Sequence, residues 1–277
     1  MGLIVLWLAL LRDNPFSSLE IKGERMRLKR VMLSLGMVAL LGSGLKADIM
    51  VYGPGGPAPV LKELAKQFEE QTKQKIQIVA GPTPSWIEKA KKDADIIFAG
   101  NSSMMDGFIK ALPKQVDAQN IQVLNIRQAG IVVRPNNPKK IKKFDDVLQK
   151  GVKVMVVDGA GQVGLYEDIA LRKGRQENLS ALRKNIVFYA PNSKAAVEKW
   201  NGDKDIDVLI IWSHWAKTLG SESAAFIPLK ADEVIYRAAE IAISNTSKQK
   251  DKAEQFVAFI QSKDAQQIWQ KWGWQTK

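Results

Sequence analysis

Short apolar runs alternate with amphipathic segments along most of the chain. Residues 48–52, 75–79 and 95–99 are apolar runs of strand length, and each is followed by a loop rich in glycine, proline or hydroxyl residues. Between residues 60 and 71, apolar side chains recur at helical spacing with lysine and glutamate between them. The order strand, loop, helix is typical of a parallel α/β sheet. Further helices are expected at 86–92 and from about residue 104.

The pattern becomes less regular after residue 128, but the same kinds of element continue. The strands expected here are at 129–134, 152–157, 185–189, 207–212, 225–228 and 234–244. The helices expected here are at 144–149, 165–173 and 193–200, followed by a long amphipathic stretch at 248–272.

The alternation breaks into two groups, which predicts two α/β lobes. Lobe 1 is expected to comprise residues 48–128 plus 245–277, and lobe 2 residues 136–231. The chain would cross between the lobes at 129–135 and again at 232–244. Each lobe would hold a mixed, mostly parallel sheet flanked by helices.

The N-terminal region has a different pattern, which is typical of a secretory signal peptide. Residues 26–30 are basic, 31–41 are apolar, and a small-residue segment follows up to Ala47. The apolar run is too short for a membrane span, which needs about 20 residues. We expect residues 26–47 to be the signal peptide and the mature protein to be free in a periplasm, without a lipid anchor. Residues 1–25 are interpreted as a non-native upstream extension, with a genuine N-terminal extension as the alternative.

Composition removes several classes of protein. The chain has no cysteine and a single histidine, His214, which excludes disulfide scaffolds, thiolate metal sites, cysteine nucleophiles and histidine-cluster metal sites. The formal net charge is +12, but the basic residues are spread out, and the densest run, at 139–143, is interpreted as solvated surface. We expect no nucleic-acid partner, no metal and no cofactor.

Four segments resemble those of type II periplasmic solute-binding proteins of ABC importers, closest to the molybdate/tungstate-binding group. They are a helix at 61–72, the strand segment 93–99, the step into the second lobe at 137–148, and the tail at 262–274. The resemblance covers essentially all of residues 48–277. It implies a two-lobed fold with two hinge crossings, a small solute held between the lobes, inner-membrane transporter subunits as partners, a monomeric protein and no enzymatic activity.

Candidate binding residues come from loops that lead into helices. The first backbone N–H groups of a helix lack intrahelical partners and carry partial positive charge, so they can hold an anion. Such loops occur at 53–59, 81–85, 100–103 and 158–164, and in α/β sheets ligands bind at the carboxyl ends of the strands. The candidate residues in these loops, with a tyrosine and two residues near the strand end at 212, are Gly55, Gly56, Thr83, Ser85, Trp86, Asn101, Ser102, Gly161, Gln162, Tyr166, Trp212 and Ser213.

The identity of the solute stays open at this point. Pro57 and Ala58 stand where molybdate-binding relatives place a serine, and proline has no N–H to donate. Trp212 replaces the tyrosine of that group and offers a large apolar or cation-binding face. A larger anion, or an organic ligand with aromatic or cationic character, therefore fits these residues at least as well as molybdate. The expected solute is oxyanion-like or a small organic anion. Two tryptophans, Trp86 and Trp212, are as well explained by core packing as by ligand contact.

Two alternatives belong to other functional classes. Residues 159–164 match the G-x-G-x-x-G pattern of dinucleotide-binding enzymes, but Asp158 precedes the pattern and no acidic residue follows the strand at 185–189. An accessory component of a multidrug efflux system, binding drugs or organic cations, would share the expected fold. His214 is interpreted as a packed residue, because no nucleophile-elbow context surrounds it.

Overall fold

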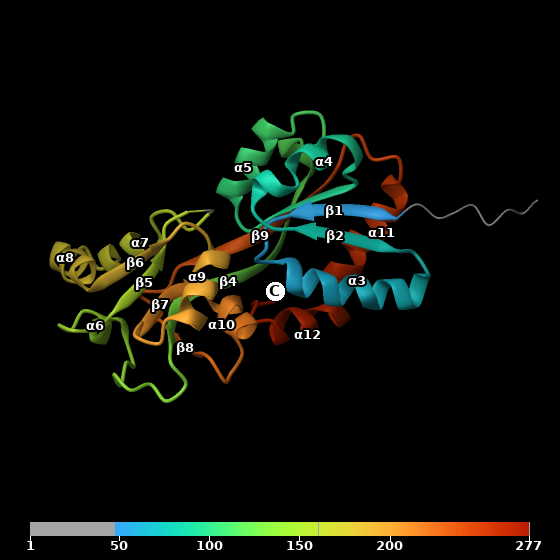
Figure 1. Ribbon diagram of the computed structural model, residues 1–277. Coiled ribbons are helices and arrows are strands. Elements are labelled where there is room, and N and C mark those ends of the chain that lie inside the picture. Colours follow the sequence, from blue (N-terminus) through green and yellow to red (C-terminus); the bar gives the residue numbers. More distant parts are fainter. Residues whose placement is uncertain (1–47, 160, 277) are drawn as a thin grey trace, which may run out of the picture. The chain divides into compact units, whose positions relative to one another are not determined.

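The computed structural model describes residues 48–159 and 161–276. The upstream extension and the signal peptide expected at 1–25 and 26–47 lie outside the described residues. Over the described part, the expected two-lobed α/β fold is confirmed (Figure 1). No described helix combines the length and the apolar character needed to cross a membrane.

A single curled sheet path of nine strands runs through both lobes in the order β2-β1-β3-β9-β4-β7-β5-β6, with β8 paired to β4. The strands are β1 (Ile49–Gly53), β2 (Ile76–Ala80), β3 (Ile96–Ala99), β4 (Ile121–Val133), β5 (Val154–Val157), β6 (Ile186–Ala190), β7 (Val208–Trp212), β8 (Ala225–Pro228) and β9 (Tyr236–Ile243).

The two lobes repeat one arrangement of strands. In lobe 1 the central strand β1 pairs in parallel with β2 and β3, and in lobe 2 the central strand β5 pairs in parallel with β6 and β7. In each lobe the third parallel strand then pairs antiparallel with a crossing strand, β9 or β4. The carboxyl ends of three parallel strands in each lobe thus become the places where a ligand can be held.

Two strands connect the lobes. β4 pairs with β9 through residues 121–128 and with β7 and β8 through residues 129–133, so one uninterrupted strand belongs to both lobes. In Figure 1, β4 and β9 run side by side between the two groups of helices. The observed strand is therefore longer than the one expected at 129–134, because residues 121–128, which mix apolar and polar side chains, also pair with β9.

Ten helices in the described residues flank the sheet. They are α3 (Ala58–Thr72), α4 (Ile87–Asp93), α5 (Ser102–Ala111), α6 (Phe144–Val147), α7 (Leu165–Leu171), α8 (Gln176–Asn185), α9 (Ser193–Gly202), α10 (Ser213–Leu219), α11 (Lys250–Gln261) and α12 (Lys263–Lys271). Two short 3-10 turns are η1 (Thr83–Ser85) and η2 (Ala118–Asn120). The expected helical stretch at 248–272 is two helices, because Ser262 is extended and its side chain caps α12 through the N–H of Ala265.

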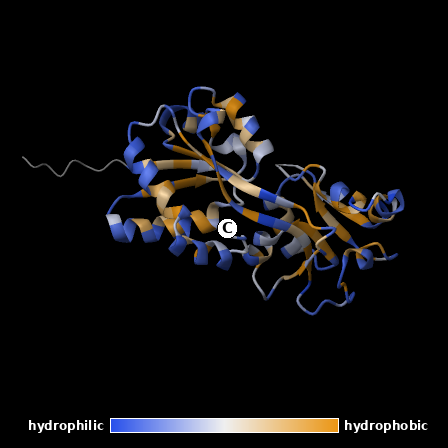
Figure 2. Cartoon of the chain, turned by 180° about the vertical axis from the view of Figure 1, so that it is seen from behind, coloured by the Kyte–Doolittle hydropathy of each residue, from blue (hydrophilic) through white to orange (hydrophobic). Residues whose placement is uncertain are grey.

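Alternating residues of each strand pack into two hydrophobic cores, one on each face of the sheet. In β3, Phe98 packs with α3, α11 and α12, whereas Ile97 packs with α4 and α5. In lobe 2, Val156 packs on the side of α6, α7 and α8, and Met155 on the side of α9 and α10. This follows from the two-residue period of a strand, and Figure 2 shows the hydrophobic residues concentrated in the strands.

Candidate functional site

A cavity of about 480 Å³ lies at the carboxyl ends of all six parallel strands. Lobe 1 contributes the loops after β1, β2 and β3, and lobe 2 those after β5, β6 and β7, while β4 contributes one arginine from between the lobes. The lining residues are Pro54, Gly55, Gly56, Pro57, Ala80, Gly81, Pro82, Thr83, Gly100, Met104, Arg127, Gln162, Asn192, Ser193, Lys194, Val197, Glu198, Trp212, His214 and Trp215.

Arg127 is the charged group at the centre of this wall. Its side chain is held between two tryptophan rings, with the guanidinium carbon 4.7 Å from the ring centre of Trp212 and 5.0 Å from that of Trp274. The residue is only 4% exposed, yet Nε and Nη1 have no hydrogen-bond partner among the described residues. A buried charge without a partner is unfavourable, so the aromatic faces position a guanidinium whose donors remain free for a ligand.

A second arginine lies opposite Arg127 on the neighbouring strand. Arg127 on β4 and Arg237 on β9 are register partners. Arg237 donates to the carbonyl of Gly161 at 3.0 Å and lies 3.7 Å from Asp168, so it has partners of its own. Burial, and then the charge of Arg237, lower the pKa of Arg127 to about 9. Arg127 therefore remains protonated at neutral pH, but an anion beside it would be strongly stabilising.

Other unpartnered polar atoms face the same cavity. They are Nε1 of Trp212, both ring nitrogens of His214, and Oε1 of Gln162. Gln162 is positioned by its amide nitrogen, which donates to Ser193 Oγ at 2.6 Å. Because buried polar groups in folded proteins are nearly always hydrogen-bonded, a cluster of exceptions at one cavity indicates a surface built for a ligand.

The cavity wall formed by α9 carries polar and charged groups of both signs. Asn192 caps this helix by accepting from the N–H of Ala195 at 3.0 Å, so that end of the helix is satisfied by its own side chain. Lys194 and Glu198 form an exposed ion pair at 3.7 Å one helical turn apart. These two charges offset each other, which leaves Arg127 as the dominant charge of the cavity.

The structure brings five of the sequence-predicted residues to this cavity. Gly55 and Gly56 lie in the loop after β1, Thr83 follows β2, Gln162 follows β5, and Trp212 ends β7. Three of the four loops expected to bind the solute in fact reach the cavity through residues that were predicted, and the fourth reaches it through Gly100.

Four other predicted residues have side chains that bond to or pack against protein groups away from the cavity. Trp86 lies in the core of lobe 1 and its indole N–H donates to the carbonyl of Gly81 at 3.2 Å. Ser85 donates to the carbonyl of Pro82 at 2.8 Å, which closes the turn. Tyr166 packs in the core of lobe 2, and Ser213 donates to the carbonyl of Gly273 at 2.7 Å. These side chains are not among the lining residues of the cavity.

The last three predicted residues form a contact between the lobes beside the cavity. Asn101 donates through Nδ2 to the carbonyl of Gly161 at 2.7 Å, and its Oδ1 accepts from the N–H of Met104. Ser102 donates through its hydroxyl to Glu240 on β9. Gly161 has a φ of +80°, and a Cβ there would come within 2.8 Å of Met104 Sδ. The loop after β5 therefore docks closely on the start of α5.

The loop that carries the dinucleotide-binding pattern, residues 159–164, takes part in this contact between the lobes. Gly159 lies so close to the turn after β6 that a Cβ would be 2.1 Å from the carbonyl oxygen of Pro191. The carbonyl of Gly161 is taken by Asn101 and Arg237. The glycines thus serve tight protein contacts, which explains the pattern without a pyrophosphate.

Sequence reasoning missed Arg127, the most distinctive residue of the site. A usable signal was present, since Arg127 is the only charged residue between 121 and 133, in a segment that becomes a strand. His214 was interpreted as a packed residue, and it is packed, but its ring nitrogens also lie in the cavity wall. Among the described residues, no group of three or more histidine, cysteine, aspartate or glutamate side chains could hold a metal ion.

A known protein family matches almost all of the described residues. The family model for bacterial extracellular solute-binding proteins matches residues 49–275. The chain belongs to this family. No curated protein sequence matches the chain.

Several solved structures match this one over most of its length. Peb3 from Campylobacter jejuni is 31% identical, with 83% of this chain and 100% of Peb3 covered and a TM-score of 0.75. A structure of PEB3 bound to L-phospholactate is 32% identical with the same coverage and a TM-score of 0.76. The periplasmic molybdate-binding protein of Azotobacter vinelandii is 16% identical, covers 83% of this chain and 100% of its own, and has a TM-score of 0.64, which shows the shared fold.

Proposed function

We propose that this solute-binding protein is the periplasmic capture component of an ABC-type importer. It binds a small organic anion between its two lobes and presents it to transporter subunits in the inner membrane. The protein performs no chemistry on the solute; its task is binding and release. The family membership supports the solute-binding role, and the cavity supports the anionic character of the solute.

The observation that carries the proposal is the unpartnered guanidinium of Arg127. A buried charge-assisted hydrogen bond contributes about 1.5–3 kcal/mol, and Nε and Nη1 are two separate donors, each of which can bind an oxygen of a carboxylate or phosphate. A positive group enclosed by tryptophan faces and apolar side chains favours an anion far more strongly than the same group in water would.

The size of the cavity supports an organic anion over a bare tetrahedral oxyanion. A volume of about 480 Å³ lies within the range of about 300–1,000 Å³ that is usual for small-molecule sites. Its walls include Trp212, Trp215 and Pro54, which suit the carbon skeleton of an organic acid. The L-phospholactate held by PEB3, a relative at 32% identity, has this character and is our first candidate probe.

The efflux alternative, with drugs or organic cations as ligands, gains no support from the cavity. A cation there would face Arg127, whose charge is not offset by any ion pair among the described residues. The only acidic side chain in the cavity lining, Glu198, is already paired with Lys194.

Release of the solute requires the lobes to separate, and the crossing strands β4 and β9 supply the connection about which they would move. The contact between Asn101 and Gly161 would then be a latch that forms when the lobes close over the solute. Hinge motion at the expected crossings, 129–135 and 232–244, is part of this proposal.

Isothermal titration calorimetry of the purified protein with L-phospholactate, sulfate and molybdate tests the proposal. We expect one L-phospholactate per protein, and we expect Arg127→Met to weaken that binding by about 100-fold, because it removes a buried charge on which the anion depends. Methionine keeps the length and the apolar stem of the arginine side chain.

Arg183→Met is the matched control for this titration. Arg183 is an exposed arginine of lobe 2 whose partner is Glu167, and it does not line the cavity. The control is expected to bind as the wild type does. Failure of all three anions to bind, or equal affinities of the Arg127→Met and Arg183→Met variants, would contradict the proposed function.

A further inference from the structure

His214 is the only histidine of the chain. It lies in the cavity wall, and neither of its ring nitrogens forms a hydrogen bond within the described residues. The residue is 3% exposed, and Nδ1 and Nε2 both lack a hydrogen-bond partner among the described residues. A neutral imidazole needs one acceptor and one donor, and a protonated imidazole needs two acceptors. In either form, the ring nitrogens lack hydrogen-bond partners unless a ligand supplies them.

Aromatic contacts, rather than hydrogen bonds, fix the orientation of this ring. The imidazole stacks on Trp274 with ring centres 5.0 Å apart and planes inclined by 22°, and Trp215 lies 5.3 Å away on another side. Nε2 points to the loop after β1, where a Cβ on Gly56 would come within 3.0 Å of it. The nitrogens are therefore held in place while their hydrogen-bonding capacity is left free.

Arg127 is the charged group that most affects the ring. Arg127 approaches from β4, and Lys217 lies on the same helix as His214. The α9 wall adds Lys194 and Glu198, which pair with each other. Loop 54–57, strand β7, strand β8 and tail 273–275 bring no titratable side chain. Burial, and then the charge of Arg127, hold the pKa of His214 well below its usual value of 6.5, so the ring is neutral in the free protein.

We propose that His214 takes up a proton when the anion binds and forms with Arg127 a two-cation site that selects solutes with at least two negative charges. This inference rests on the proposed function and defines its substrate class. A dianion supplies acceptors for both guanidinium donors and for a protonated imidazole, so it satisfies the orphaned nitrogens together. A monoanion is neutralised by Arg127 alone and leaves His214 unprotonated.

Proton uptake has a thermodynamic consequence that identifies it. If the bound anion favours the protonated ring, protonation must favour the anion by the same free energy. The affinity for a dianion then rises as the pH falls, by up to about tenfold per pH unit for one proton. A histidine that merely fills space would leave the affinity unchanged over this range.

Nuclear magnetic resonance tests the inference directly, because one histidine gives one set of imidazole signals. The full protein, purified without a histidine tag and labelled with 15N at histidine, is compared with and without L-phospholactate at about pH 7. We expect two widely separated 15N shifts in the free protein and two similar shifts, typical of the protonated ring, in the complex. Saturation by L-phospholactate with the neutral pattern retained would overturn the inference and leave the proposed function standing, whereas absence of any binding would overturn the proposed function as well.

Calorimetry of variants supplies a second measurement. Between about pH 7 and about pH 8, the wild type and Lys217→Met are expected to lose affinity for L-phospholactate as the pH rises, whereas His214→Gln, which keeps a donor and an acceptor but cannot titrate, is expected to show a flat profile. A flat wild-type profile contradicts the inference. L-lactate, a monoanion, is expected to bind the wild type at least about 100-fold more weakly than L-phospholactate, and affinities within tenfold would contradict the two-charge requirement.

Discussion

Two arginines seven residues apart in the chain lie over tryptophan rings, but they differ in how many of their hydrogen-bond donors have partners. Arg134, just after β4, lies 3.6 Å from the ring centre of Trp200 and donates to the carbonyls of Ile206, Trp200 and Asp203 at 3.0, 3.1 and 2.6 Å. Arg127, within β4, lies between two tryptophans and has no partner for Nε or Nη1.

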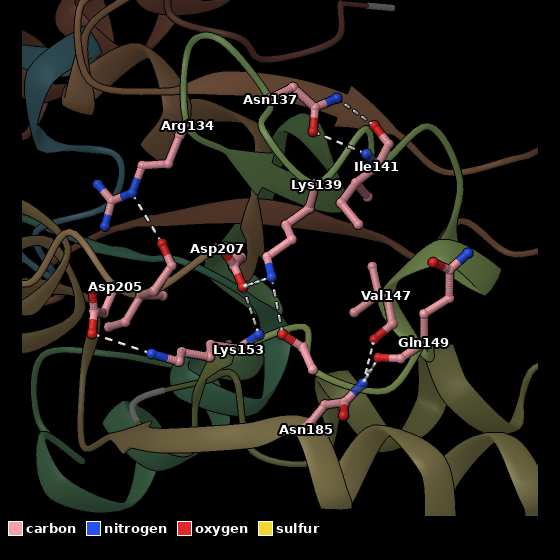
Figure 3. Close-up of polar contacts among 12 residues, drawn as sticks. Arg134, Asn137, Lys139, Ile141, Val147, Gln149, Lys153, Asn185, Asp205 and Asp207 are labelled. Atoms are coloured by element: carbon pink, nitrogen blue, oxygen red, sulfur yellow. Dashed lines mark hydrogen bonds and ion pairs between the residues drawn. The ribbon is translucent and has the colours of Figure 1, made fainter.

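The surroundings of the two guanidiniums explain this difference. Arg134 follows the end of β4, and a neighbouring group of hydrogen bonds joins Lys153 to Asp205 and Asp207 (Figure 3). Burial lowers the pKa of Arg134, but Asp203 and Asp207 oppose that effect. Near Arg127 the neighbouring charge is another arginine. Arg134, whose donors are hydrogen-bonded within the protein, stabilises the fold. Arg127, whose Nε and Nη1 donors have no partner, is available to bind a ligand.

Removing each guanidinium is expected to give the largest difference in stability between the two sites. Arg134→Met strands three carbonyl groups, so we expect the free energy of unfolding to fall by about 2 kcal/mol. Arg127→Met removes a buried, unpaired charge, so we expect a change below about 1 kcal/mol, in either direction. Urea denaturation of both variants without ligand gives these values. A larger loss for Arg127→Met than for Arg134→Met would show that Arg127 is a structural residue.

The contact between the lobes offers a test of intermediate size. Gly161 and Gly151 have similar backbone angles, with φ of +80° and +87°, but only Gly161 lies against the other lobe. Alanine at either position is expected to lower the free energy of unfolding by about 1 kcal/mol, because L side chains rarely adopt such angles. Gly161→Ala is in addition expected to weaken the binding of L-phospholactate by about tenfold, since the added Cβ disturbs Met104 and Asn101.

Gly151→Ala is the control for the latch. A Cβ there meets nothing within 4 Å, so calorimetry should show wild-type affinity for L-phospholactate. Equal affinities of the two alanine variants would mean that the contact between Asn101 and Gly161 does not contribute to holding the solute.

The smallest expected effect concerns pH in the absence of ligand. The pKa of His214 is lowered in the folded protein, so below the unfolded value of 6.5 the unfolded chain binds a proton that the folded chain does not. Stability is therefore complete above pH 6.5 and is lost as the pH falls below it, by about 1 kcal/mol over the first unit. Urea denaturation of the wild type and His214→Gln measures the difference; parallel pH profiles would show that His214 is already satisfied in the free protein.

Sequence periodicity was a good guide to the fold because strands and helices in each lobe alternate and bury one stripe each. Val154–Val157 and Val208–Trp212 are continuous apolar runs because both faces of the sheet are covered. The N-terminal half of β4 was missed, since Gln122 and Arg127 interrupt its apolar pattern and its pairing with β9 is a long-range contact. Helix α8 was also missed, because its mean polarity is high and only Leu182 and Asn185 are buried.

The site was predictable in its loops but not in its charged centre. Parallel strands bring their following loops to one edge whatever the side chains are, so Gly55, Thr83 and Gln162 could be found from the strand pattern. The roles of Arg127 and His214 depend on what their polar atoms fail to meet, which only a three-dimensional arrangement reveals. Trp274, near the end of the chain, could not be linked to Arg127 from sequence for the same reason.

A crystal structure of the protein with L-phospholactate would show whether Arg127 holds the solute. We expect acidic oxygens of the ligand within hydrogen-bond distance of Nε or Nη1 of Arg127, inside the cavity between the lobes. A complex in which the ligand lies elsewhere, or in which it fills the cavity without contacting Arg127, would contradict the proposed role of this arginine.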